Sequence, residues 1–124
     1  MENDNSKFKI EFKKRLYSFV LRLIKYINKL PRSPSNDVIG KQLLRSGTSI
    51  LANFIEANPA SSKKDFINFF THSLKSANES KVWLTLFRDT NDIEKEENDF
   101  LIKELCEIAN IIASSILTLK GKKK

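Results

Sequence analysis

The sequence contains very little cysteine, histidine, glycine or proline. With one cysteine, Cys106, and one histidine, His72, no disulfide can form within the chain and no Cys/His metal cluster can form within one copy. Three glycines and three prolines are too few for the turns of a sheet protein, which favours long helices. No apolar run approaches the ~20 residues of a membrane span, and residues 1–10 lack the apolar stretch of a signal peptide. We therefore expect a cytoplasmic protein with no membrane association.

The same scarcity means that few of the usual catalytic residue types and motifs are present. There is no Glu-x-x-His pair, the pattern of di-iron bundles. Small helical ribonucleases of the HEPN type place an arginine a few residues before a histidine, and residues 65–68 before His72 contain none. The glycines are too scattered for a phosphate-binding loop, and Cys106 lies in an apolar run typical of a core thiol. The sequence therefore predicts no catalytic residue, no cofactor and no metal site.

Charge is unevenly distributed along the 124 residues. The formal net charge is +7, yet residues 1–35 carry +6, residues 91–119 carry −5, and residues 120–124 contain four lysines. A basic first segment suits a polyanionic partner such as nucleic acid. Alternatively, a basic first helix and an acidic fourth helix attract each other within or between subunits. The composition leaves both interpretations open.

Apolar residues at helical spacing predict an all-α, antiparallel up-down-up-down four-helix bundle, formed as one domain by residues 1–124. The predicted helices span about residues 6–30, 36–57, 62–90 and 93–119, with frayed residues 1–5 and a lysine-rich tail at 120–124. The clearest apolar stripe steps by four and three residues along the first helix: Phe12, Leu16, Phe19, Leu23, Tyr26 and Leu30.

Turn residues predict the helix ends. Pro31 and Pro34 end the first helix, and Asn58-Pro59 ends the second. The N-cap candidates are Ser35, Asn36 or Asp37 for the second helix and Ser61 or Ser62 for the third. Gly47 and Ala52 are expected to allow close backbone approach, and Gly121 to end the fourth helix.

A polar stripe on the second helix is not explained by a plain bundle. Gln42, Ser46, Ser49, Asn53 and Glu56 step by four and three residues, and a matching polar set on the third helix consists of His72, Lys75 and Glu79. Small polar residues at this spacing suit close helix contact, so we favour a subunit interface over a solvated outer face or a catalytic groove. Arg45 and Lys75 are the expected partners of the two glutamates.

Residues 41–88 carry a recognisable signature. It consists of QLLRSGTSI-x-AN-x-x-EA, then A-x-SKKDF, then a Lys and a Glu four residues apart, then WL. This signature resembles that of bacterial four-helix-bundle proteins encoded by intervening sequences of large-subunit ribosomal RNA genes. The accessory protein of diversity-generating retroelements belongs to the same family and resembles this chain in fold. One departure is Lys75-Ser76, where the family commonly has Lys-Glu.

The resemblance implies a ring-like homopentamer and, in the retroelement branch, a basic surface that engages nucleic acid and a reverse transcriptase. The motif positions carried over as a subunit interface or buried polar network are Arg45, Ser46, Ser49, Asn53, Glu56, Lys75 and Glu79. The candidate contacts to RNA or DNA, which would touch phosphates and carry little sequence information, are Lys13, Lys14, Arg15, Arg22, Lys25, Lys29, Arg32, Lys63 and Lys64.

The expected function is therefore that of a non-enzymatic oligomeric bundle that binds nucleic acid electrostatically as an adaptor or accessory factor. The alternative is a structural or protein-interaction module whose charges serve subunit assembly. Trp83, on the third helix, is expected to pack in a core or interface and not to stack on bases.

Overall fold

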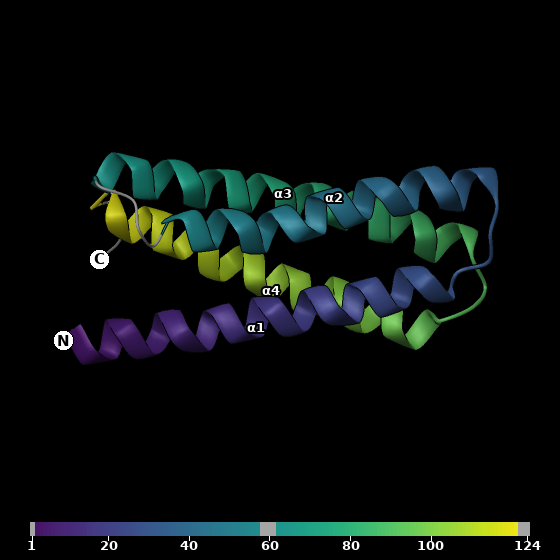
Figure 1. Cartoon of the computed structure of the whole chain (residues 1–124), viewed down its shortest axis with the longest axis horizontal. Coiled ribbons are helices and arrows are strands. Elements are labelled where there is room, and N and C mark those ends of the chain that lie inside the picture. Colours follow the sequence, from purple (N-terminus) through teal and green to yellow (C-terminus); the bar gives the residue numbers. More distant parts are fainter. Residues whose placement is uncertain (1, 58–61, 122–124) are drawn as a thin grey trace.

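Four helices make up the described part of the chain. The computed structural model describes residues 2–57 and 62–121, with side chains from residue 7 onward. The helices are α1 (Glu2–Lys29), α2 (Pro34–Ala57), α3 (Lys63–Thr90) and α4 (Lys95–Leu119), and the described residues contain no strand. Successive helices run in opposite directions, and both termini lie at one end of the bundle (Figure 1). The predicted fold class is confirmed.

The starts of the helices follow local capping chemistry. Ser62 caps α3, because its Oγ accepts from Asp65 N at 3.1 Å, as one of the two candidates predicted. The predicted caps of α2 were wrong: Ser33 Oγ accepts from Asn36 N at 3.1 Å. The helix therefore starts at Pro34, whose missing N–H costs nothing in a first turn.

Both ends of α4 are marked by a residue with a left-handed backbone conformation. Glu94 precedes α4 with φ 55 and makes no side-chain cap bond, and Gly121 follows that helix with φ 72. A left-handed residue is the usual helix terminator, so the predicted role of Gly121 is confirmed. The predicted stop at Asn58-Pro59, the candidate cap Ser61 and residues 122–124 of the tail lie outside the described residues. The backbone of residues 2–5, expected to fray, is part of α1.

The core follows the predicted apolar stripes. All six residues of the α1 stripe are buried. On α3, the buried position is taken by Ser73 and not by its apolar neighbour Leu74, which is only partly buried, and the Ser73 hydroxyl donates to Ile50 O at 2.8 Å. Gly47 is buried against Leu23, whereas Ala52 is exposed, so the close approach expected at Ala52 was wrong.

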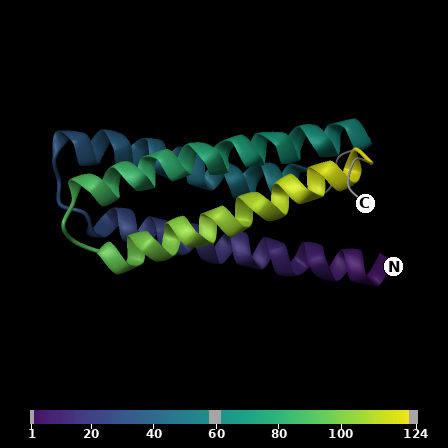
Figure 2. The same cartoon turned by 180° about the vertical axis from the view of Figure 1, so that it is seen from behind.

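The helices are not packed equally tightly. α2 and α3 form the most extensive pair, and α1 against α4 the least extensive. Seen from behind, α4 crosses α1 and the two diverge toward the end that carries the termini (Figure 2). Within the described ranges, no helix is both long and apolar enough to cross a bilayer. The divergence of α1 and α4 determines where the surface is hollowed.

Candidate functional site

One member of the predicted polar stripe is fully buried between α2 and α3. Ser46 Oγ lies 2.7 Å from Ser80 Oγ, and both residues are 0% exposed. Each hydroxyl also reaches a carbonyl of its own helix, Ser80 Oγ that of Ser76 at 2.8 Å and Ser46 Oγ that of Leu43 at 3.3 Å, so either serine can be the donor of the pair. Ser46 is therefore part of a polar contact inside one protomer and cannot face a neighbouring subunit. Ser80 was missed from the sequence.

A charged cluster lies outside this serine pair. It belongs to a surface that we call the polar flank of α2, formed by Gln42, Arg45, Ser49, Asn53 and Glu56. Arg45 forms an ion pair with Glu79, and its Nε and Nη2 donate to Gln42 Oε1 at 3.2 and 3.0 Å. Trp83 Nε1 donates to Glu79 at 3.4 Å, and its ring packs against the core. Arg45 is thus the partner of Glu79, and Trp83 packs as expected.

The remaining stripe residues are turned back on α2 or exposed. Ser49 Oγ donates to Arg45 O at 2.8 Å, and Asn53 Nδ2 donates to Ser49 O at 2.9 Å. Glu56 and Lys75 are exposed. The flank therefore offers polar side chains that are ordered by their own helix and accessible to another molecule. That subunits meet here stays a prediction.

Ion pairs join α1 to α4 along a line that we call the α1–α4 seam. Arg15 Nε and Nη2 donate to the two Glu104 oxygens at 2.6 and 2.8 Å, and Nη2 also donates to Glu107 at 2.7 Å. Arg22 donates to the two oxygens of Glu97 at 2.8 and 2.7 Å. Two-point contacts of this kind fix the relative orientation of the two side chains in addition to bringing opposite charges together.

The seam has a regular antiparallel register. Seven residues along α1, from Arg15 to Arg22, correspond to seven residues back along α4, from Glu104 to Glu97. Hydrogen bonds from Arg15 hold the pKa of the Glu104 carboxyl below its usual range, and the same bonds raise the pKa of Arg15. Arg22 lowers the pKa of Glu97 in the same way. The carboxylates are thus held ionised by their arginine partners.

Two further cations of the candidate nucleic-acid set have acidic partners. Lys29 Nζ lies 3.8 Å from Glu94, and Arg32 donates to both oxygens of Asp37 at 2.9 and 3.0 Å. The other five are exposed and form no ion pair within 4.0 Å among the described residues: Lys13, Lys14, Lys25, Lys63 and Lys64. The structure therefore divides the nine candidates into paired cations and unpaired lysines.

A buried amide at the start of α4 was also missed from the sequence. Asn98 is 1% exposed, and its Nδ2 donates to Tyr26 Oη at 2.8 Å and to Leu84 O at 2.9 Å. Its Oδ1 is buried without a partner among the described residues. The signal was present, because Asn98 precedes Leu101 and Leu105 at the same helical spacing. Cys106, expected in the core, is only half-buried.

The chain is similar to known proteins in both sequence and fold. Residues 9–114 match the family model described as 23S rRNA-intervening sequence protein. A similar solved structure is that of a protein of unknown function from the S23 ribosomal protein family of Bacteroides thetaiotaomicron VPI-5482. It is 37% identical, with a TM-score of 0.78 over 85% of this chain and 97% of that chain. No curated protein matches the chain.

Proposed function

The chain belongs to the family of 23S rRNA-intervening sequence proteins, and on this premise we propose that it is a non-enzymatic, pentameric bundle that binds nucleic-acid phosphates as an adaptor or accessory factor. The observation that carries the proposal is the set of five exposed lysines without acidic partners in the described chain. The four paired cations are left out of the binding surface, because their charge is already neutralised within the protomer.

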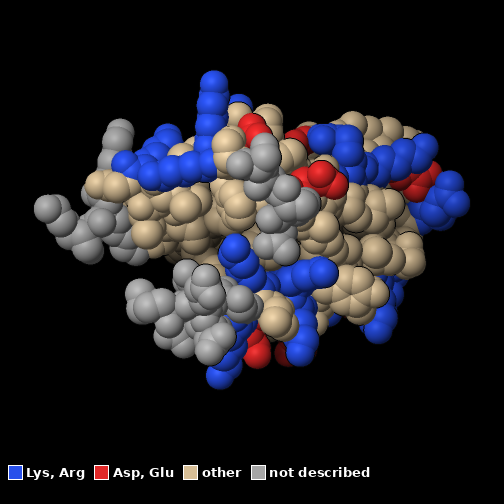
Figure 3. All heavy atoms as spheres, turned by 60° about the vertical axis from the view of Figure 1, so that its left-hand side comes forward, with Lys and Arg blue, Asp and Glu red and all other residues tan. Residues whose placement is uncertain are grey.

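The unpaired lysines are placed to contact a backbone, not to read bases. Lys14 and Lys25 are eleven residues apart on α1, which is three helical turns, so they project from the same side about 16 Å apart. Lys63 and Lys64 begin α3 at the end of the bundle where the termini lie, an end on which lysine and arginine are more abundant than acids (Figure 3). Lysine binds phosphate as a flexible point charge, so this surface would bind with little sequence preference.

The test compares two triple variants of the full chain. Lys13→Ala, Lys14→Ala and Lys25→Ala remove three unpaired lysines of α1. Lys41→Ala, Lys81→Ala and Lys103→Ala remove the same charge from the other helices. Fluorescence anisotropy with structured RNA and duplex DNA, repeated over a range of salt, gives the slope of log affinity against log salt.

We expect the α1 variant to lose roughly 0.9 of that slope for each phosphate contact removed. The control should keep the slope of the parent protein. If the parent binds neither nucleic acid at low salt, or if both variants weaken equally, the proposal is wrong.

A second candidate, a structural or protein-interaction module, is favoured by the α1–α4 seam. Arg15 and Arg22 form ion pairs with Glu104 and Glu97 of the same chain, so part of the positive charge of α1 holds that helix against α4. In this case the remaining charges of α1 serve assembly, and Lys13→Glu with Lys14→Glu should lower the oligomer mass without changing nucleic-acid affinity. Unchanged mass by light scattering would count against this candidate.

The polar flank of α2 is the proposed place of assembly. Asn53→Leu and Glu56→Ala should each change the oligomeric state or lower its stability, because an interface loses its matched polar contacts, at about 1–3 kcal/mol. Size-exclusion chromatography with light scattering measures the state, and Leu44→Ser serves as a control, because Leu44 is exposed and lies on the opposite side of α2 from Asn53. A fully folded monomer at micromolar concentration would contradict the pentameric proposal.

A further inference from the structure

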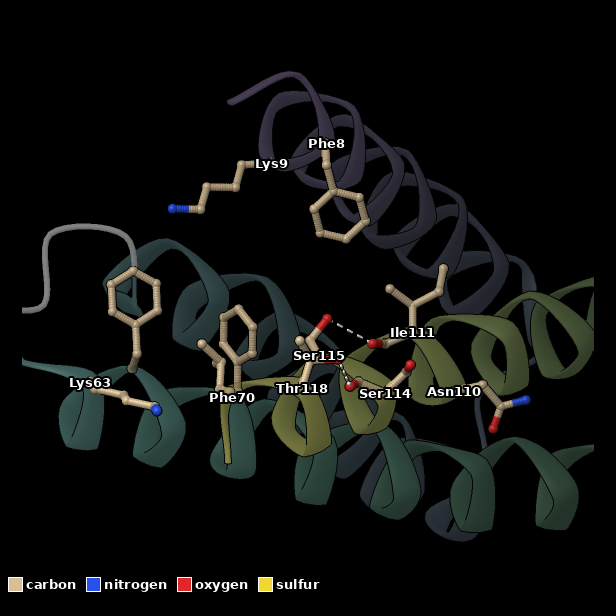
Figure 4. Close-up of a pocket in the computed structure, with 11 residues that line it drawn as sticks. Phe8, Lys9, Lys63, Phe70, Asn110, Ile111, Ser114, Ser115 and Thr118 are labelled. Atoms are coloured by element: carbon tan, nitrogen blue, oxygen red, sulfur yellow. Dashed lines mark hydrogen bonds between the residues drawn. The ribbon is translucent and has the colours of Figure 1, made fainter. Parts of the chain in front are cut away.

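The α1–α4 seam opens into a groove at the end of the bundle that carries both termini. Its volume is about 880 Å³, and α1, α3 and α4 all contribute to its walls. The apolar wall residues are Phe8, Phe66, Phe70, Ile111 and Leu119. Figure 4 shows Phe8 projecting from α1 toward Ile111 of α4, above Phe70 of α3. The groove is therefore a concave apolar surface built by three helices.

The register of the seam explains why the groove is there. The charged pairs end at Arg15, and the next positions seven residues along are Phe8 on α1 and Ile111 on α4. The two helices diverge from this point, so their apolar side chains do not close over one another (Figures 1 and 2). Phe8 is left 45% exposed. A contiguous exposed apolar surface of this kind commonly marks a binding site.

Charge at the groove is of one sign and at one end. Of the described residues that line it, only Lys9 and Lys63 are charged. Both ammonium groups lie toward the same end, and Asn110 lies at the other (Figure 4). Lys9 Nζ is 5.1 Å from the centre of the Phe66 ring, which holds the charge beside the apolar wall. The complementary ligand has an apolar body and an anionic end.

We propose that this groove binds a long-chain carboxylate, with the hydrocarbon tail against Phe8, Phe70 and Ile111 and the carboxylate between Lys9 and Lys63. The volume lies in the range of small-molecule pockets, roughly 300–1,000 Å³. From Asn110 to Leu119 the lining of α4 spans nine steps, about 14 Å at the rise of a helix. A concave groove of that length, with walls from three helices, fits a hydrocarbon chain better than it fits a flat protein surface. The groove shares Lys63 with the proposed nucleic-acid surface but contains none of the α1 lysines of that surface, and its proposed ligand does not depend on the proposed function.

The first experiment uses dodecanoate below its micelle-forming concentration, measured by isothermal titration calorimetry and native mass spectrometry on the full chain. Dodecyltrimethylammonium supplies the same tail with the opposite charge, and acetate supplies the carboxylate without a tail. We expect one dodecanoate per chain, binding by the cation weaker by about ten-fold or more, and no binding of acetate. Equal binding of dodecanoate and the cation, or no binding of dodecanoate, overturns the proposal.

The second experiment locates the site. Lys9→Glu with Lys63→Glu should weaken dodecanoate binding by about ten-fold or more, whereas Lys14→Glu with Lys25→Glu, which changes net charge equally, should leave it unchanged. Phe8→Ala removes a wall residue of the groove and should also weaken binding; because the Phe8 ring stacks on the buried Phe12 ring at 5.6 Å, urea unfolding of this variant is measured beside its binding. Equal weakening by both charge variants overturns the assignment. So does a dodecanoate affinity that falls as protein concentration and oligomer mass rise, because a second copy then occupies the groove.

Discussion

Helix α2 packs close to α1 at Gly47. A Cβ built on Gly47 would overlap Cδ2 of Leu23 and lie 3.7 Å from its Cγ. Leu23 is 0% exposed, so its methyl group cannot swing into solvent to make room. Gly40, on the same helix, is different, because a Cβ there would meet Ile27 Cγ2 at 3.5 Å, an ordinary contact. The two glycines therefore form a matched pair for testing the approach.

Two opposing effects decide the outcome of Gly47→Ala. Alanine is favoured over glycine inside a helix by about 1 kcal/mol. Forcing an extra methyl group into a filled core costs about 1–3 kcal/mol. Gly40→Ala should show the first effect alone and stabilise the protein by about 1 kcal/mol. Because the helix term cancels between the two variants, Gly47→Ala should be less stable than Gly40→Ala by about 1–3 kcal/mol.

Urea unfolding followed by circular dichroism at one fixed protein concentration measures both variants. At this chain length the difference corresponds to a shift in Tm of roughly 4 °C per kcal/mol. Leu23→Ala, introduced into Gly47→Ala, should cost less than it does in the parent, because the added methyl group then occupies vacated space. Equal stability of Gly47→Ala and Gly40→Ala would refute the close approach.

Three further predictions concern polar contacts. The stability that the lowered pKa of Glu104 contributes is complete at neutral pH and is lost as pH falls through the folded-state pKa. Glu104→Gln should therefore make the free energy of unfolding less dependent on pH in the acid range. An unchanged pH dependence contradicts this. Ser46→Ala and Ser80→Ala should each cost about 1 kcal/mol by urea unfolding, and the double variant less than their sum; strict additivity would argue against the pair. Asn98→Ala should cost about 2 kcal/mol and Tyr26→Phe about 1, because the amide makes two bonds; equal losses in thermal melts would count against that difference.

The fold could be predicted from periodicity because burial of one stripe per helix leaves a direct trace in the sequence. The helix starts could not be fixed to the residue. Ser33 and Pro34 together outcompete Ser35 as a start for α2, because proline is well suited to a first turn. The left-handed Glu94 carries no sequence signal, since glutamate rarely adopts that conformation.

The candidate site could be predicted only in part, because spacing gives the side of a helix but not the depth of each residue. Ser46 and Ser49 are neighbours in the same stripe, yet three residues turn a helix by about 300°, so they differ in direction by about 60°. That difference buries Ser46 against Ser80 and leaves Ser49 bonded to its own helix. Segment charges likewise indicated attraction between the first and last helices. The segment charges could not show that Arg15 pairs with Glu104 of the same protomer.

The seven-residue register of the α1–α4 seam also constrains how the length of such a bundle can change. Inserting one residue between Arg15 and Arg22 would rotate one arginine by about 100° and carry it away from its glutamate. An insertion of seven residues preserves the face, but only if α4 gains seven between Glu97 and Glu104 as well. Relatives that keep this line of ion pairs should therefore differ in helix length by paired heptads, added to the first and fourth helices together.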